Sequence, residues 1–199
     1  MAALLALHCV CMSFSRTQKP RSFLDEVALH EYALRLLGQQ MRSIAEVRRK
    51  LLGRVEPDES GNAKVEAVLN RLREYRLVDD AAFADNFVQM RQQNQKLGPR
   101  RVRNDLAMKG VSQQLAAETI EARYAEVSEE TLARQHLERK RIRKPENEKD
   151  TARVMRRLVA AGFSTGVIYK ILRQWEIPEE ALSVLADTDA DTTTDVEDP

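Results

Sequence analysis

Cysteine, glycine and aromatic residues are scarce in this sequence of 199 residues, and each scarcity excludes a class of structure. The two cysteines, Cys9 and Cys11, lie in the first dozen residues, so no disulfide framework or cysteine metal cluster organises the fold. Only 7 residues are Gly and 5% are aromatic, whereas 43% are hydrophobic and 32% are charged. This composition favours a helical globular chain over an extensive sheet, and we predict an all-α protein.

Long apolar runs are also missing. Nothing reaches the roughly 20 apolar residues that a transmembrane helix needs. The apolar opening MAALLALHCVCM lacks the basic flank of a signal peptide. We therefore expect a cytoplasmic protein with no membrane partner and with Met12 as its true start; a weak signal peptide is the alternative.

The small formal charge of +1 is the sum of a strongly basic body and an acidic C-terminal tail. Nine of the 31 acidic residues follow Arg173 and no basic residue does, so residues 1–175 carry 32 basic and 22 acidic side chains, a net charge of +10. Such a basic body is typical of a protein that meets nucleic acid or an acidic protein surface. We expect the acidic tail to be disordered and to compete weakly for the basic body.

No motif indicates catalysis. The three histidines are scattered, and the sequence has no H-E-x-x-H, phosphate-binding loop or dinucleotide fingerprint. We expect no catalytic residue, no metal and no cofactor.

One pattern occurs three times along the chain. The spacing Val-x3-Leu is found at Val47–Leu51, Val102–Leu106 and Val154–Leu158. In the second and third copies it continues into Gly110-Val111-Ser112 and Gly162-Phe163-Ser164. The pattern predicts that Gly ends one helix, the apolar residue fills the corner and Ser caps the next helix.

Each copy is flanked by an apolar-periodic segment on both sides, so each repeat should contain three helices. A unit of about 50 residues is near the lower limit for burying its own core, which favours stacking into an elongated curved array. The predicted divisions are an N-terminal extension (1–26), three repeats (27–77, 78–126 and 127–186) and the acidic tail (187–199).

Local patterns predict the helix ends and the core. Ser43 and Glu46 have the spacing of a capping box. Asp79 and Asp80 should cap the helix that follows them. In that helix Phe83 and Ala84 are expected in the core.

The stretch KLGPRRVRNDLAMKG, residues 96–110, is a short and basic helix with clear ends. Pro99 suits a first helical position, and Gly110 suits the left-handed residue after the end. Val102 and Leu106 share one side with the stem of Lys109, and they too are expected in the core, while the opposite side is cationic.

The outer side of the middle helix is basic in all three copies. A solvated surface is the plain interpretation of one such helix, but independent solvated faces would seldom repeat in register. We predict a continuous cationic stripe that suits a phosphate backbone or an acidic protein groove. The predicted binding residues of this stripe are Arg49, Lys50, Arg91, Lys96, Arg100, Arg101, Arg103, Lys109, Arg139, Lys140, Arg141, Arg143, Lys144, Arg153, Arg156 and Arg157.

Over about residues 33–175 the chain resembles the RecX family, bacterial regulators of the RecA recombinase. The motifs that carry the resemblance are Arg42-Ser43-x-x-Glu46-Val47-x-x-Lys50-Leu51, Leu77-Val78-Asp79-Asp80-x-x-Phe83-Ala84, Gly98-Pro99-x-x-Val102-x-x-Asp105-Leu106-x-x-Lys109-Gly110-Val111 and Gly162-Phe163-Ser164. The departures are Val47 in place of Leu, Asp105 in place of Glu, and Ala160-Ala161 in place of a frequent basic pair.

The resemblance implies three tandem three-helix repeats, as a monomer, in the groove of a RecA–DNA filament. There the protein would restrain the recombinase, ATPase and co-protease activities of RecA in DNA repair and the SOS response, with single- or double-stranded DNA nearby. Capping of filament ends and binding along the groove both stay open. The alternative is a stand-alone helix-turn-helix-like DNA-binding protein, although the stripe has almost no aromatic residue for base stacking.

Overall fold

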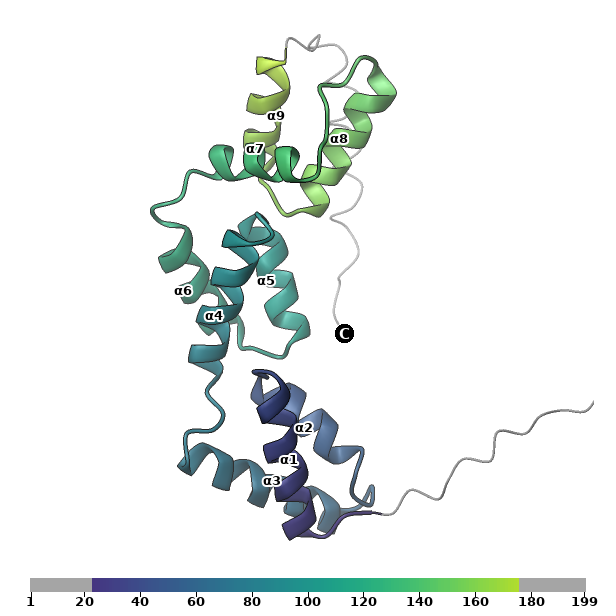
Figure 1. The fold of residues 1–199 in the computed structure, drawn as a ribbon, viewed down its shortest axis with the longest axis vertical. Coiled ribbons are helices and arrows are strands. Elements are labelled where there is room, and N and C mark those ends of the chain that lie inside the picture. The colour runs from purple at the N-terminus through teal and green to yellow at the C-terminus, as the bar shows by residue number, and fades with distance from the viewer. Residues whose placement is uncertain (1–22, 176–199) are drawn as a thin grey trace, which may run out of the picture.

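The computed structural model describes residues 23–175, which form an elongated array (Figure 1). The predictions for the start of the chain and for the acidic tail concern residues outside this range. Within it the helices are α1 (Glu26–Gln39), α2 (Ile44–Leu52), α3 (Glu59–Glu74), α4 (Asp80–Gln93), α5 (Pro99–Met108), α6 (Gln113–Tyr124), α7 (Glu129–Arg139), α8 (Glu148–Ala160) and α9 (Thr165–Gln174).

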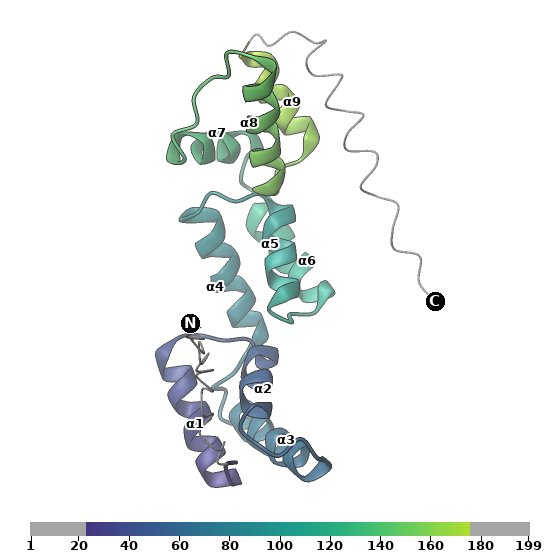
Figure 2. The same ribbon diagram turned by 90° about the vertical axis from the view of Figure 1, so that its right-hand side faces the viewer.

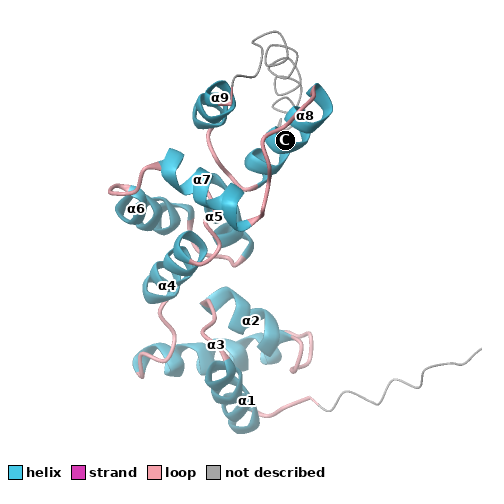
Figure 3. Cartoon of the chain, turned by 45° about the horizontal axis from the view of Figure 1, so that its top comes forward, coloured by secondary structure: helices cyan, strands magenta, loops and turns pink. Residues whose placement is uncertain are grey.

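The helices are grouped in threes, and the groups follow one another along the long axis in both side views (Figures 1 and 2). In each group the first and second helices pack against the third. Each group also has its own cluster of buried apolar side chains. The described residues contain no strand (Figure 3). The predicted all-α array of three-helix repeats is therefore confirmed.

The repeated apolar pattern forms the centre of each core. All six of its side chains are buried, with 4% exposure or less: Val47, Leu51, Val102, Leu106, Val154 and Leu158. Phe83 and Ala84 are buried as well. Burial of a large aliphatic side chain stabilises a fold by about 1.5–3 kcal/mol, so the pattern contributes to the core of every repeat.

The glycines of the pattern end their helices as predicted. Gly110 and Gly162 have φ angles of +77° and +88°, a region in which an L side chain is strained. Ser112 then caps α6 by accepting a hydrogen bond from the N–H of Leu115 at 3.4 Å. The same role predicted for Ser164 is wrong, because its hydroxyl donates to Glu129 Oε2 at 2.9 Å instead.

Two further capping predictions need correction because neighbouring repeats compete for the same groups. Asp79 caps α4 as predicted, but Asp80 accepts a hydrogen bond from the N–H of Ile44, at 2.8 Å, in the first repeat. Ser43 accepts from the N–H of Glu46 at 3.1 Å, as half of a capping box. The other half is not formed, since the carboxylate of Glu46 lies 2.7 Å from Lys109 Nζ.

The middle helices α2, α5 and α8 stack head to tail in one column (Figure 2). The C-terminal end of α8 contacts the N-terminal end of α5, where the N–H of Gly98 donates to Ala161 O at 2.8 Å and that of Arg100 donates to Gly162 O at 3.2 Å. The C-terminal end of α5 likewise contacts α2, where the Ser43 hydroxyl donates to Lys109 O at 2.5 Å. Each joint satisfies helix-end groups that have no partner within their own helix.

The joint between the second and third repeats also needs the small size of glycine. A Cβ atom on Gly98 would lie 2.3 Å from Gly162 O, and one on Gly162 would lie 2.2 Å from the backbone nitrogen of Arg101. Neither contact can relax by moving a flexible side chain, because both partners are backbone atoms. The glycines that end and begin these helices therefore also set how closely the repeats approach.

We predict that Gly162→Ala lowers the free energy of unfolding by roughly 1–3 kcal/mol, the usual cost of a strained backbone position, since it adds strain at positive φ and a clash in the joint. The measurement is denaturant unfolding followed by circular dichroism. Gly166→Ala is the matched control, because a Cβ there meets no atom within 4 Å. Equal unfolding curves for the two variants would contradict the close joint.

Candidate binding surface

Half of the sixteen predicted cationic residues lie on the column of middle helices, and the others lie on α4, on α7 or in the segments between helices. Thirteen of the sixteen are exposed, and Arg91, Lys96 and Lys109 are partly buried. Eight of these exposed cations lie on the column itself: Arg49 and Lys50 on α2, Arg100, Arg101 and Arg103 on α5, and Arg153, Arg156 and Arg157 on α8. Head-to-tail stacking thus aligns positions that are about fifty residues apart in the sequence.

Most of these cations are not used by the fold. Within the described residues, ten of them have neither a hydrogen bond nor an ion pair through the side chain: Arg49, Lys50, Lys96, Arg100, Arg103, Lys140, Arg141, Arg143, Arg156 and Arg157. Arg153 forms only an exposed ion pair with Asp150 at 3.3 Å, and Lys144 is exposed in the loop before α8. The ten cations with no side-chain partner within the described residues contribute little to folding and are free to bind an anionic partner.

Four of the predicted binding residues instead make structural contacts. Lys109 pairs with Glu46 across the first joint, and Glu46 is only 7% exposed. Arg139 donates to the backbone carbonyl of Asn94 in the second repeat. Arg91 and Arg101 both contact Asp105, a contact described next. Sequence reasoning missed these contacts because their partners are mostly distant in the chain.

Asp105 is a buried carboxylate that holds two arginines. It is 5% exposed, accepts a hydrogen bond from Arg101 Nε at 2.9 Å, and lies 3.4 Å from Arg91 Nη2. Its position three residues after Val102, on the core side of α5, is the sequence feature that could have revealed this role. Both guanidinium groups therefore contact a buried carboxylate, which holds Arg101 at the surface and Arg91 in a partly buried position.

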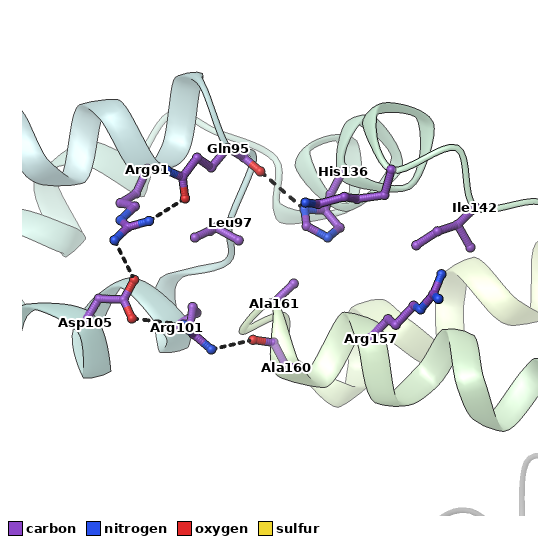
Figure 4. A pocket seen from close by; sticks show the side chains of 11 residues that line it. Arg91, Gln95, Leu97, Arg101, Asp105, His136, Ile142, Arg157, Ala160 and Ala161 are labelled. Carbon is purple, nitrogen blue, oxygen red and sulfur yellow. Dashed lines mark hydrogen bonds and ion pairs between the residues drawn. The ribbon is translucent and has the colours of Figure 1, made fainter. Parts of the chain in front are cut away.

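A cleft of about 520 Å³ lies where the second and third repeats meet (Figure 4). Its walls come from both repeats, and its lining residues are Arg91, Gln95, Leu97, Arg101, Asp105, His136, Lys140, Ile142, Arg157, Ala160 and Ala161. Figure 4 shows Arg157 rising from α8 toward Ile142, on the side of the cleft opposite Arg91. Four cations and one carboxylate give this lining a net charge of +3.

Two smaller hollows adjoin this cleft and share an arginine with it. Arg157 also lines a basic hollow of about 320 Å³ formed by the loop between α7 and α8. Arg91 also lines a hollow of about 400 Å³ between the first two repeats, whose walls include Met41, Phe87 and Met90. The lining of these hollows is thus cationic toward the third repeat and more apolar toward the first.

His136 connects the repeats on the inner side of the cleft. Its Nδ1 lies 3.0 Å from Lys96 O and 3.3 Å from Gln95 O, so Nδ1 carries the proton and donates to these carbonyl groups. The ring also packs edge-on against Phe163, with centroids 5.7 Å apart. Burial lowers the pKa of His136 below its usual value.

The described residues lack two kinds of feature. They contain no group of three or more His, Cys, Asp or Glu side chains arranged to hold a metal ion. Among the helices of this range, none is long and apolar enough to cross a bilayer. The fold and the surface together define a helical-repeat protein with exposed cations along its middle helices.

Comparison with known proteins identifies the family. The profile of the first three-helix domain of RecX matches residues 30–72, and that of the second three-helix domain matches residues 79–120. A regulatory protein RecX of Thermus thermophilus is 36% identical over 150 residues, which cover 75% of this chain and 91% of the relative. One of Thermobifida fusca is 33% identical over 154 residues, which cover 76% and 80%. The chain belongs to the RecX family of regulatory proteins.

Solved structures agree with this assignment. A crystal structure of a regulatory protein RecX matches with a TM-score of 0.61 and 25% identity, over 75% of this chain and 71% of that one. A crystal structure of RecX from Lactobacillus salivarius shares the fold, with a TM-score of 0.58 and 21% identity over 76% of this chain and 96% of that one.

We predict that the joint between the second and third repeats weakens as the pH falls below about 7. The folded pKa of His136 is lowered, so the unfolded chain binds more protons near its unfolded pKa of about 6.5, and acid favours unfolding. His136→Asn keeps an N–H donor but does not titrate. Thermal melts between about pH 7.5 and pH 5.5 should therefore shift less in this variant; parallel shifts would contradict the role of His136.

Proposed function

We propose that this protein regulates RecA by binding the RecA–DNA filament along its cationic concave side. The protein acts as a cytoplasmic monomer and restrains the recombinase, ATPase and co-protease activities of RecA during DNA repair and the SOS response. Membership of the RecX family supports the choice of RecA as the partner.

The observation that carries the proposal is the alignment of unpaired cations along three stacked middle helices. A filament presents the same groups again and again along its axis. An array with one cationic pair in each repeat can therefore make successive contacts with it, and each added contact raises the overall affinity. An isolated globular surface with the same charges would offer only one such contact.

The test is to reverse the charge of one pair in each repeat: Arg49/Lys50, Arg100/Arg103 and Arg156/Arg157 to Glu. None of the six has an ion pair to lose within the described residues. The fold should be nearly unaffected, with helix-dipole effects of about 0.3–1 kcal/mol for the changes in last turns. Inhibition of the DNA-dependent ATPase of RecA should fall stepwise as one, two and three pairs are changed.

The matched control reverses Lys64 and Arg71 on α3, a lysine and an arginine that lie outside the predicted stripe and have no side-chain partner within the described residues. This variant should inhibit like the unmodified protein. A folded variant with all three pairs reversed that still inhibits at unchanged concentrations would overturn the proposal.

A further inference from the structure

We propose that the cleft between the second and third repeats is a binding site for the phosphodiester backbone of DNA, with Lys140 and Arg157 as its phosphate ligands. The inference deepens the proposed function, on which it rests, by assigning one part of the cationic side to DNA and not to RecA. It predicts binding to DNA in the absence of RecA.

The charge of the cleft is arranged for an external anion. The single carboxylate in the lining, Asp105, has a side chain that is 6% exposed and is already held by Arg91 and Arg101. Lys140 and Arg157 line the same cleft and have neither a hydrogen bond nor an ion pair within the described part of the chain. Their positive charge is therefore uncompensated in a cleft whose lining has no accessible acid to repel a phosphate.

The walls strengthen this field. Leu97, Ile142, Ala160 and Ala161 supply apolar surface around the cations. Low-dielectric walls on both sides of a cationic cleft focus its potential and raise the local concentration of anions. A volume of about 520 Å³ is also within the range of sites for small ligands, and it accommodates a nucleotide unit.

An extended polyanion fits better than a single acidic side chain. Arg157 is shared with the neighbouring hollow, whose lining adds four cations, Arg141, Arg143, Lys144 and Arg153, and two carboxylates, Glu146 and Asp150, of which Asp150 is paired with Arg153. Closely and regularly spaced phosphates can engage such a continuous track, and release of their counterions drives binding.

The lining also indicates that the bases are not read. No Phe, Tyr or Trp lines either the cleft or the adjoining basic hollow, so neither offers an aromatic platform on which a base could stack. The site should therefore bind DNA of different sequences with similar affinity. Single-stranded and double-stranded DNA present the same phosphodiester chemistry, and the experiment distinguishes them.

The experiment measures binding of the full chain to labelled oligo-dT and to a duplex of mixed sequence, without RecA, over a range of salt concentrations. Lys140→Ala/Arg157→Ala should weaken binding roughly tenfold at low salt and flatten the slope of log affinity against log salt. Loss of two contacts changes this slope by about 1.4 if the ligand is single-stranded and by about 1.8 if it is a duplex. The form of DNA for which the salt slope changes by the expected amount is the ligand of the cleft.

Two controls keep the result decisive. Lys64→Ala/Arg71→Ala also removes one lysine and one arginine, but from α3, and should leave DNA binding unchanged. Slow hydrogen exchange at the N–H groups of Gly98 and Arg100, which both donate across the joint, should persist in the cleft variant and show that the repeats remain joined.

Unchanged DNA affinity and salt slope in the folded cleft variant would overturn the proposal. Polyglutamate is the competing probe: if the variant loses affinity for polyglutamate but keeps its affinity for DNA, the cleft recognises an acidic protein surface and the proposal is wrong. Either result would leave the charge-reversal test of RecA inhibition untouched, because that test also changes the pairs on α2 and α5.

Discussion

The contact between the C-terminal end of one middle helix and the N-terminal end of the preceding one is the interaction on which the array depends. Each repeat buries its own small core, so the cores alone do not fix how the repeats are oriented. Backbone hydrogen bonds at Gly98 and Arg100 fix one joint, and the Ser43 hydroxyl and the Glu46–Lys109 ion pair fix the other. Opposite ends of helix dipoles meet at each joint, which favours this alignment.

The joints also explain why glycine recurs in the repeated pattern. A helix that ends at a left-handed residue needs Gly for its φ angle, and a helix end that packs onto another backbone needs Gly for its size. Gly162 meets both needs at once. Gly98 meets only the second, since it precedes α5 with ordinary φ, and its lack of a capping side chain is offset by the carbonyl group of Gly162.

Sequence reasoning reached the fold because its rules are local. Helix ends, the spacing of Val102 and Leu106 and the three-fold recurrence all depend on residues within one or two turns of each other. It failed wherever a polar side chain had a choice of partners. Asp80, Glu46 and Ser164 each lie where a local cap was expected, and each bonds to another element at least 35 residues away in the chain.

The candidate binding surface was predictable as a set of charges but not as a shape. The outer position of Arg49, Arg100 and Arg156 follows from helical periodicity, and exposure follows from charge. The cleft between repeats could not be foreseen, because its walls come from two repeats that meet through contacts between residues distant in the chain, such as the packing of Gly98 on Gly162. The ion pairs of Arg91 with Asp105 and of Lys109 with Glu46 could not be predicted either, because their partners are distant in the chain.

A comparison of the two joints shows why only one of them forms a cationic cleft. By the offsets of the repeated pattern, Glu46 corresponds to Arg101 and Lys109 corresponds to Ala161. The first joint therefore closes with an ion pair between its two repeats, and the second has a cation facing an alanine. With no acid from the neighbouring repeat, Arg101 turns to Asp105 of its own helix. The small Ala161 leaves room beside it, and the charges of Lys140 and Arg157 remain uncompensated in that space. The same joint geometry thus makes a closed contact in one place and an open cationic cleft in the other, through two changes of side chain.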